Sequence, residues 1–181
     1  MADDDAANRI LAVLLKGFAG LYGVGVRSRA RQFRMGRLVS HRLPCKVVSV
    51  GNIALGGTGK TPMSVYLARL IHRAGYRVAV VSRGYKGLAE KNGGVVSDGQ
   101  ALQMDPTTAG DEPYLMAQQL LPSGIPVIVG RDRVRSGLLA VEHFQTEVIV
   151  LDDGFQHMRL QRDLDIVLLD ARHPFGNGHL L

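Results

Sequence analysis

The segment of this chain that most constrains its fold is a glycine-rich stretch at residues 51–62, which reads GNIALGGTGKTP. It directly follows the apolar run at residues 47–50 and precedes a stretch that is typical of a helix. Glycines let backbone N–H groups curl around an anion, and the start of a helix adds a partial positive charge. A buried strand, a glycine-rich turn, Gly-Lys-Thr and a helix in this order predict a loop that binds nucleotide phosphates.

Eight consecutive residues are predicted to contact the nucleotide: Ala54, Leu55, Gly56, Gly57, Thr58, Gly59, Lys60 and Thr61. The Lys60 ammonium can reach the outer phosphates, and the Thr61 hydroxyl can coordinate Mg²⁺. Ala54 is a mild departure, because glycine is usual at the first position of this pattern. An ordinary glycine-rich turn is the alternative, but the order of strand, loop, Lys-Thr and helix favours a nucleoside triphosphate and Mg²⁺ as ligands.

The positive charge of the chain is concentrated near its start. The net charge is +6, and between Asn8 and Lys46 there are nine Lys or Arg residues and no acid. Such an excess beside an apolar stretch indicates an anionic partner, either lipid head groups or nucleic acid. Only Phe33 is an aromatic residue interleaved with these arginines, and no nucleic-acid-binding module is recognisable, so we expect no nucleic-acid partner. The single cysteine, Cys45, excludes an internal disulfide framework.

Residues 10–26 form the one segment that could meet a membrane. Seventeen helical residues reach about 25 Å, short of the roughly 30 Å hydrocarbon core, and Lys16 would fall near the middle. A helix that lies in the membrane interface, with the following arginines on the head groups, fits better. A helix packed on the protein's own core is the alternative. We therefore expect a basic amphipathic membrane-interface segment at residues 1–45 and a P-loop domain at residues 46–181.

The remainder of the chain alternates short apolar runs with amphipathic stretches. Strands are predicted at residues 47–50, 78–82, 127–129, 148–151 and 166–169, all covered on both faces. Helices are predicted at residues 61–74, 113–121 and 133–144, and residues 84–110 are predicted to be a loop or short hairpin over the nucleotide site. This alternation predicts an α/β fold: a P-loop NTPase-like, doubly wound, mostly parallel sheet, preceded by an N-terminal amphipathic helix.

Two acidic segments carry candidate chemistry. Asp152 and Asp153 follow the apolar run at residues 148–151, which places carboxylates at the carboxyl end of a strand, where ligands bind in open α/β sheets. Turn aspartates before Gly154 are the alternative. Asp111 and Glu112 precede Pro113 and match the capping acids of a helix start. An exposed aspartate there can instead accept a proton from an attacking hydroxyl.

The chain resembles the tetraacyldisaccharide 4′-kinase family of the lipid A pathway in five segments: VGNIALGGTGKTP (50–62), VVSRGYKG (80–87), GDEP (110–113), LDDGFQH (151–157) and FGNGHLL (175–181). The resemblance implies a kinase at the cytoplasmic face of the inner membrane. It would transfer the γ-phosphate of ATP to the 4′-hydroxyl of a tetraacylated glucosamine disaccharide 1-phosphate, a lipid A precursor, and give lipid IVA. Its partners would be ATP, that disaccharide and the anionic membrane surface.

The resemblance also implies roles for individual residues. Asp111 matches the catalytic base, and Lys60 and Asp153 complete the catalytic set. Thr61, Asp152 and Glu112 are the candidate Mg²⁺ ligands, although the sequence leaves open which of the two adjacent aspartates contacts the metal. Family members continue into a second domain that supplies a histidine partner for the base, so we expect residues 1–181 to be an amino-terminal fragment. A membrane-associated P-loop switch ATPase of the partitioning or targeting type is the alternative function.

Overall fold

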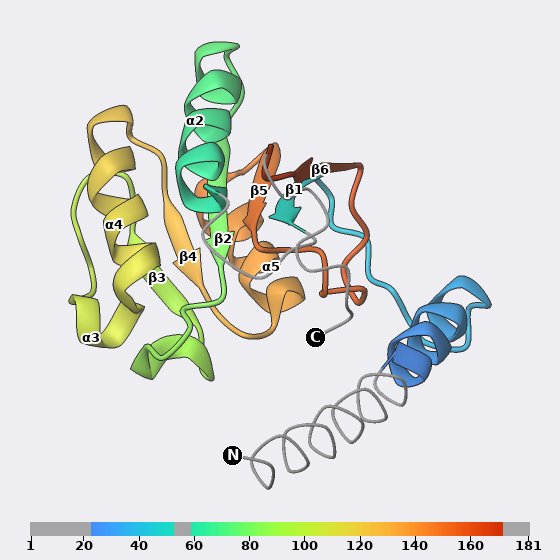
Figure 1. Cartoon of the computed structure of the whole chain (residues 1–181). Helices are drawn as coiled ribbons and strands as arrows, with labels where there is room; N and C mark the ends of the chain where they lie inside the picture. The colour runs from blue at the N-terminus through green and yellow to red at the C-terminus, as the bar shows by residue number, and fades with distance from the viewer. Residues whose placement is uncertain (1–22, 53–58, 172–181) are drawn as a thin grey trace, which may run out of the picture. The chain divides into compact units, whose positions relative to one another are not determined.

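The structure of the protein is a computed structural model that describes residues 23–52 and 59–171 (Figure 1). Residues 54–58 of the predicted phosphate loop, and most of the predicted amphipathic helix, lie outside the described residues. The chain divides into two compact units, residues 1–39 with 176–181 and residues 40–175. In the first unit residues 23–34 are helical. No helix among the described residues is long and apolar enough to span a bilayer.

The second unit is built on one six-stranded sheet. Its strands are β1 (Lys46–Asn52), β2 (Val78–Ser82), β3 (Gly94–Ser97), β4 (Val127–Val129), β5 (Val148–Asp152) and β6 (Leu164–Leu168). They lie in the order β3-β4-β2-β5-β1-β6, and every neighbouring pair is parallel except β3 with β4. The five predicted strands and the α/β class with a mostly parallel sheet are therefore confirmed.

Two expectations about the edges of the sheet are wrong. Residues 84–110 were expected to be loop or hairpin, but they contain the edge strand β3, the 3₁₀ turn η1 (Leu88–Glu90) and the short helix α3 (Pro106–Ala109). Two glycines, Gly93 and Gly94, mask the strand signal in the sequence. The prediction that every strand is covered on both faces fails for β6, whose Leu164 and Val167 are about half exposed among the described residues.

Three longer helices cover the two faces of the sheet. They are α2 (Lys60–Arg73), α4 (Asp111–Leu120), which the 3₁₀ turn η2 (Leu121–Ser123) follows, and α5 (Arg133–Phe144). Figure 1 shows α2 and α4 in front of the sheet and α5 behind it. The alternation along β2 fits these layers, because Val78 and Val80 pack with the cluster under α2 and α4, and Ala79 and Val81 with the cluster under α5.

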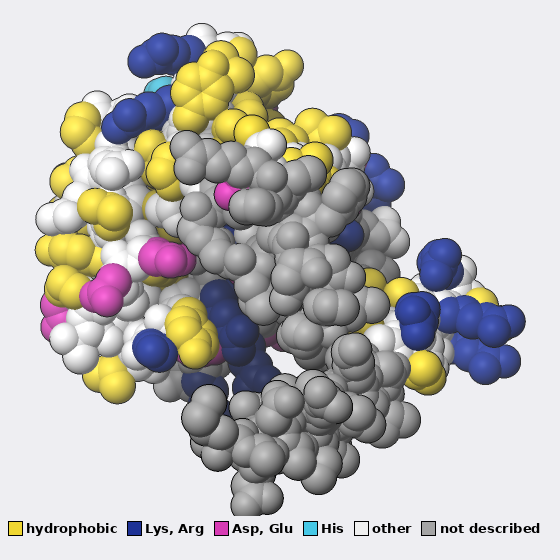
Figure 2. Space-filling model, in the orientation of Figure 1, with side chains coloured by type: hydrophobic (Ala, Val, Ile, Leu, Met, Phe, Trp, Pro, Cys, Tyr) yellow, Lys and Arg dark blue, Asp and Glu magenta, His cyan; other side chains and the backbone are white. Residues whose placement is uncertain are grey.

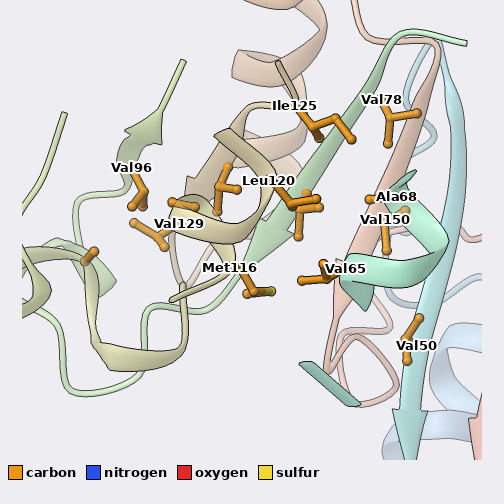
Figure 3. Packing of buried hydrophobic residues seen from close by; sticks show 14 of the residues in the cluster. Val50, Val65, Ala68, Val78, Val96, Met116, Leu120, Ile125, Val129 and Val150 are labelled. Atoms are coloured by element: carbon orange, nitrogen blue, oxygen red, sulfur yellow. The ribbon is translucent and has the colours of Figure 1, made fainter. Parts of the chain in front are cut away.

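The front cluster fixes α2 and α4 on the sheet. Val65 and Ala68 of α2 and Met116 and Leu120 of α4 are almost fully buried. Figure 3 shows Val65 and Met116 pointing toward one another between the two helices. Burying an aliphatic side chain of this size contributes about 1.5–3 kcal/mol. This packing therefore fixes the positions of Lys60 and Asp111, the first residues of the two helices, at the carboxyl end of the sheet.

The direction in which the chain crosses the sheet changes between β1 and β5. From β1 the chain crosses through α2 to β2 on one side, whereas from β5 it continues to β6 on the other side. Ligands in open α/β sheets bind in the crevice at such a switch point, beyond the carboxyl ends of the strands. The β1–β5 register pairs Val50 with Asp152. Asn52 and Asp153 are therefore brought to the same end of the sheet.

Candidate active site

Helix α2 begins at the candidate site with a glycine in a left-handed conformation. Gly59 is the N-cap residue, with φ of 78° and ψ of 24°, and no side chain caps the helix. The first turn contains no acidic residue, so its free N–H groups and the partial positive charge of the helix start remain available to an anion. The Lys60 Nζ atom donates a hydrogen bond of 2.9 Å to Asn52 Oδ1 at the end of β1. Thr61, the candidate metal ligand, is the second residue of α2 and is partly buried.

Asp152 is a buried carboxylate held by two serines. It ends β5 and is only 3% exposed. Its Oδ1 accepts a hydrogen bond of 2.9 Å from Ser64 Oγ, and its Oδ2 accepts one of 3.3 Å from Ser82 Oγ. Burial raises the pKa of Asp152, and the nearby carboxylates of Glu112 and Asp153 raise it further against the two hydrogen bonds. The side chain is thus fixed in position beside other negative charges.

Asp153, the next residue, has a different environment. Its backbone is left-handed, with φ of 53°, which is uncommon for a residue with a side chain. Its side chain is 61% exposed, and its Oδ1 lies 3.6 Å from Lys60 Nζ. The turn continues through Gly154, where an added Cβ would approach Ser49 Oγ to 2.5 Å. The tight turn therefore directs one acid into the fold and the other toward Lys60.

Asp111 and Glu112 form the first turn of α4 but do not cap it. The N-cap residue is Gly110, with φ of 89°, and the helix start has no side-chain cap hydrogen bond. Both side chains are exposed. The helix begins two residues before the predicted Pro113, so the two acids lie within it. The capping interpretation is therefore wrong for Asp111, and its carboxylate is available to a ligand.

A cleft of about 510 Å³ contains most of the residues described above. It is lined by Lys60, Ser82, Arg83, Tyr85, Lys86, Pro106, Thr107, Gly110, Asp111, Glu112, Pro113, Asp152 and Asp153. Figure 2 shows dark blue basic side chains in a hollow of this face and magenta acidic ones toward α4. A larger hollow of about 710 Å³ lies at the amino ends of β1 and β5. Its lining includes Arg42 and Glu147 but none of the predicted site residues. We therefore place the candidate active site in the 510 Å³ cleft.

The sequence analysis missed several residues that act on Asp152 in this cleft. Ser64 lies one helical turn after Lys60, so the helical repeat brings it to the same face of α2. Ser82 is the last residue of β2, so the pairing of the strands brings it to the same end of the sheet. Arg133, the first residue of α5, is 4% exposed and donates from Nη1 to Gly130 O at 2.8 Å. Burial and Arg83 lower the pKa of Arg133 to about 10, so at neutral pH it is still a cation. Asp152 and Asp153 oppose that shift, which places a buried positive charge near both aspartates.

His157, at the end of the LDDGFQH motif, is partly buried. Its Nε2 atom is buried, and the described residues offer it no hydrogen-bond partner. Burial lowers the pKa of His157 to about 4, and Arg133 adds to this effect. The imidazole is therefore neutral at pH 7.

The low pKa of His157 predicts a pH-dependent stability. The ordinary pKa is 6.5 and the folded-state pKa about 4, so the unfolded chain binds the proton more tightly. The stabilisation is complete above pH 6.5 and is lost as the pH falls toward 4. The free energy of unfolding is expected to fall between pH 6.5 and pH 4 in the unmodified protein. In His157→Gln this fall is expected to be smaller by on the order of 1–2 kcal/mol.

Denaturant unfolding at several pH values measures this difference. The exposed His143 provides a matched control, because His143→Gln also removes one histidine. An identical pH dependence in the unmodified protein and His157→Gln would contradict the assignment of a neutral, buried imidazole.

Comparison with known proteins identifies relatives across nearly the whole chain. The family model for tetraacyldisaccharide-1-P 4′-kinase, LpxK, matches residues 11–181. The tetraacyldisaccharide 4′-kinase of Syntrophus aciditrophicus is 51% identical over 170 residues, which are 94% of this chain and 45% of that protein. The one from Desulfatibacillum aliphaticivorans is 49% identical over 160 residues, which are 88% of this chain and 43% of that protein.

A solved structure shares the fold. A crystal structure of LpxK from Aquifex aeolicus in complex with ATP, described as an "apo" form, superposes with a TM-score of 0.81 at 42% identity. The match covers 90% of this chain and 50% of that one. The chain therefore spans about half the length of the relatives it matches.

Proposed function

Since the chain belongs to the tetraacyldisaccharide 4′-kinase family, we propose that the protein transfers the γ-phosphate of ATP to the 4′-hydroxyl of tetraacyldisaccharide 1-phosphate, a step of lipid A biosynthesis that gives lipid IVA. The observation that carries the proposal is the shared cleft. It contains Lys60, Asp153 and the exposed Asp111 within one volume of about 510 Å³. The alternative, a membrane-associated switch ATPase, is not favoured, because the matched family and relatives are kinases.

The residues divide the work of phosphoryl transfer between them. The Lys60 ammonium, with the start of α2, stabilises the charge of the transferring phosphate, and Asp153 orients Lys60 through their 3.6 Å ion pair. Residues 54–61 bind the nucleotide phosphates. Asp111 accepts the proton of the attacking hydroxyl, because its carboxylate faces the same cleft and forms no helix cap.

The carboxylates of the cleft also fit a magnesium ion. No group of three or more His, Cys, Asp or Glu side chains is arranged as a ready metal site within residues 23–52 and 59–171. Mg²⁺ in kinases usually takes one or two carboxylates together with substrate phosphates, so no such group is needed. The carboxylates of Glu112 and Asp153 both raise the pKa of Asp152, and a divalent cation would relieve this repulsion. We assign Thr61, Asp152 and Glu112 to Mg²⁺, which would neutralise charge on the phosphates.

A transfer assay tests the proposed function. The protein in its full-length form is incubated with radiolabelled ATP, Mg²⁺ and tetraacyldisaccharide 1-phosphate in mixed micelles. Label in the lipid product supports the kinase. ATP hydrolysis that depends on vesicles or DNA, with no labelled lipid, would overturn it and support a switch ATPase.

The start of the chain supports attachment to an anionic membrane, at the cytoplasmic face of the inner membrane. The described helical residues 23–34 carry four arginines, Arg37 follows them, and no acid occurs among them. Arg29 lies over the Phe33 ring at 6.0 Å, while Val24 and Val26 are exposed. A polar face rich in arginine beside exposed apolar residues is typical of a helix in the interface.

Deletion of residues 1–26 removes the apolar segment at residues 10–26 but keeps these arginines, and it is expected to release much of the protein from vesicles that contain anionic lipid. Each basic residue near such a surface contributes about 1 kcal/mol, so attachment of the intact protein is also expected to weaken with salt. Co-sedimentation with anionic and with zwitterionic vesicles measures both effects. Sedimentation that neither the deletion nor salt changes would favour a helix packed on the protein's own core.

A further inference from the structure

Two buried serines hold the Asp152 carboxylate from two different elements. Ser64 Oγ, on α2, donates a hydrogen bond of 2.9 Å to Asp152 Oδ1, and Ser82 Oγ, at the end of β2, donates one of 3.3 Å to Oδ2. The two serines are 0% and 4% exposed. A carboxylate oxygen can accept more than one hydrogen bond, so each oxygen keeps a further lone pair for a ligand. Asp152 also lines the cleft, so the serines determine how its carboxylate is presented there.

Ser64 occupies a position of α2 where packing alone would favour an apolar side chain. The buried residues of this helix are Ser64, Val65 and Ala68, and Ser64 is the polar one. Figure 3 shows Val65 and Ala68 in the same apolar cluster as Val150 of β5. A buried hydroxyl costs free energy unless it is hydrogen-bonded, and the Ser64 hydroxyl donates to Asp152. The hydroxyl at this position is therefore explained by the carboxylate and not by the packing of the core.

Ser82 reaches the carboxylate through the register of the sheet. β2 is buried throughout, and Ser82 is the polar residue of its sequence VAVVS. The register between β2 and β5 pairs Val81 with Leu151. The next residues of the two strands, Ser82 and Asp152, therefore lie side by side. The Ser82 hydrogen bond is longer than that of Ser64, 3.3 Å against 2.9 Å, so Ser64 is expected to have the larger effect on the carboxylate.

Ser64 also links the carboxylate to the helix that carries the nucleotide-binding residues. It follows Lys60 by four residues and Thr61 by three, within the first turns of α2. Three residues along a helix correspond to a rise of about 4.5 Å. The hydrogen bond from Ser64 therefore fixes the position of Asp152 relative to Thr61, which we also assign to Mg²⁺. Mg²⁺ demands a nearly ideal octahedral geometry, so the relative position of two ligands affects its binding.

We propose that Ser64 is a positioning residue of the magnesium site: assisted by Ser82, it holds the Asp152 carboxylate in the orientation that binds Mg²⁺, in register with Thr61. The proposal rests on the proposed function, and within it on the assignment of Thr61 and Asp152 to the metal. Ser64 itself does not line the cleft. It acts through Asp152, so its removal is expected to weaken the binding of Mg²⁺ and to leave the direct contacts to the nucleotide phosphates unchanged.

Calorimetric titration of the full-length protein with a non-hydrolysable ATP analogue, in Mg²⁺ and in EDTA, tests the proposal without turnover. Ser64→Ala is expected to weaken binding of the analogue in Mg²⁺ by about 10–100-fold, the usual effect of removing a group that orients a metal ligand, and to leave binding in EDTA within about twofold. Ser82→Ala is expected to have a smaller effect of the same kind. Equal losses in Mg²⁺ and EDTA, or no loss in either, would overturn the proposal.

Ser136 provides a matched control on the other face of the sheet. It is a buried serine of α5, 4% exposed, and its Oγ donates a hydrogen bond of 3.2 Å to Val129 O. Ser136→Ala and Ser64→Ala each remove one buried hydrogen bond, so both are expected to lower stability, which denaturant unfolding without Mg²⁺ measures. Only Ser64→Ala is expected to weaken the binding that depends on Mg²⁺. The same loss of this binding in Ser136→Ala would make Ser64 an ordinary buried serine and contradict the proposal.

A double-mutant cycle shows whether Ser64 acts through Asp152. In Asp152→Asn protein, Ser64→Ala is expected to cause little further loss of Mg²⁺-dependent binding, whereas independent effects would add. Additive losses would contradict the positioning role. These titrations use no acceptor, so the two proposals fail separately. Absence of lipid phosphorylation by a protein that gives the expected titrations would overturn the kinase function alone, and normal phosphorylation with unchanged titrations in Ser64→Ala would overturn the positioning role alone.

Discussion

Lys60→Ala is expected to lower the rate of phosphoryl transfer by about 10²–10³-fold, because removing one preorganised positive contact to a developing charge has an effect of this size. The Lys60 ammonium lies 2.9 Å from Asn52 Oδ1 and 3.6 Å from Asp153 Oδ1. These contacts hold the charge at the carboxyl ends of β1 and β5, where the transferring phosphate is proposed to lie. A transfer assay on the full-length protein measures the loss.

Loss of activity through unfolding is distinguished from loss of the charge by two measurements. Lys60 is partly exposed and pairs with an exposed Asp153, so we expect its removal to change the free energy of unfolding by no more than about 1 kcal/mol. Lys91, an exposed lysine outside the cleft, provides a matched control, and Lys91→Ala is expected to keep full activity. Activity of Lys60→Ala within a few-fold of the unmodified protein would contradict the phosphate-loop assignment.

The sheet was predictable because local patterns determine most of it. The continuous apolar runs around Val80 and Val150 have the composition of strands with both faces covered, and both strands are buried in the middle of the sheet. The three long helices were predicted within two residues at each end. Periodicity and helix-start chemistry are local, so the sequence reveals them.

Features that depend on contacts between distant segments could not be predicted in this way. β3 is an edge strand that begins with Gly94 and exists only because it pairs with β4. The exposure of Leu164 in β6 depends on which segments pack against the strand, and the apolar sequence of the strand does not reveal them. Tertiary context therefore decided both edges of the sheet.

The two adjacent aspartates show the same limit within the candidate site. The sequence indicates an acidic pair at a strand end but does not distinguish Asp152 from Asp153. Strand pairing places Ser82 beside Asp152, and helix packing brings Ser64 to it, so that carboxylate is buried and fixed. The left-handed backbone of Asp153 directs the other carboxylate to Lys60. The two adjacent residues are therefore proposed to have different roles, Asp152 toward Mg²⁺ and Asp153 toward Lys60.

Asp111→Asn is expected to lower turnover by about 10²–10⁴-fold, the usual contribution of a positioned general base. The amide has nearly the shape of the carboxylate but cannot accept the proton of the acceptor hydroxyl. Because Asp111 lies in the cleft near Lys60 but is not assigned to the nucleotide, affinity for a non-hydrolysable ATP analogue is expected to stay the same. Calorimetric titration with the analogue, beside the transfer assay, measures both quantities.

Stability separates a base from a helix cap. Asp132, at the start of α5, does cap its helix, since its Oδ1 accepts hydrogen bonds of 3.0 Å from Val134 N and 3.3 Å from Arg135 N. Asp132→Ala is therefore expected to cost about 1 kcal/mol of stability and to lower the melting temperature. Asp111→Ala is expected to leave it nearly unchanged, because Gly110 occupies the N-cap position of α4. Near-normal turnover of Asp111→Asn, or a loss of stability in Asp111→Ala that matches Asp132→Ala, would show that Asp111 supports the helix rather than the reaction.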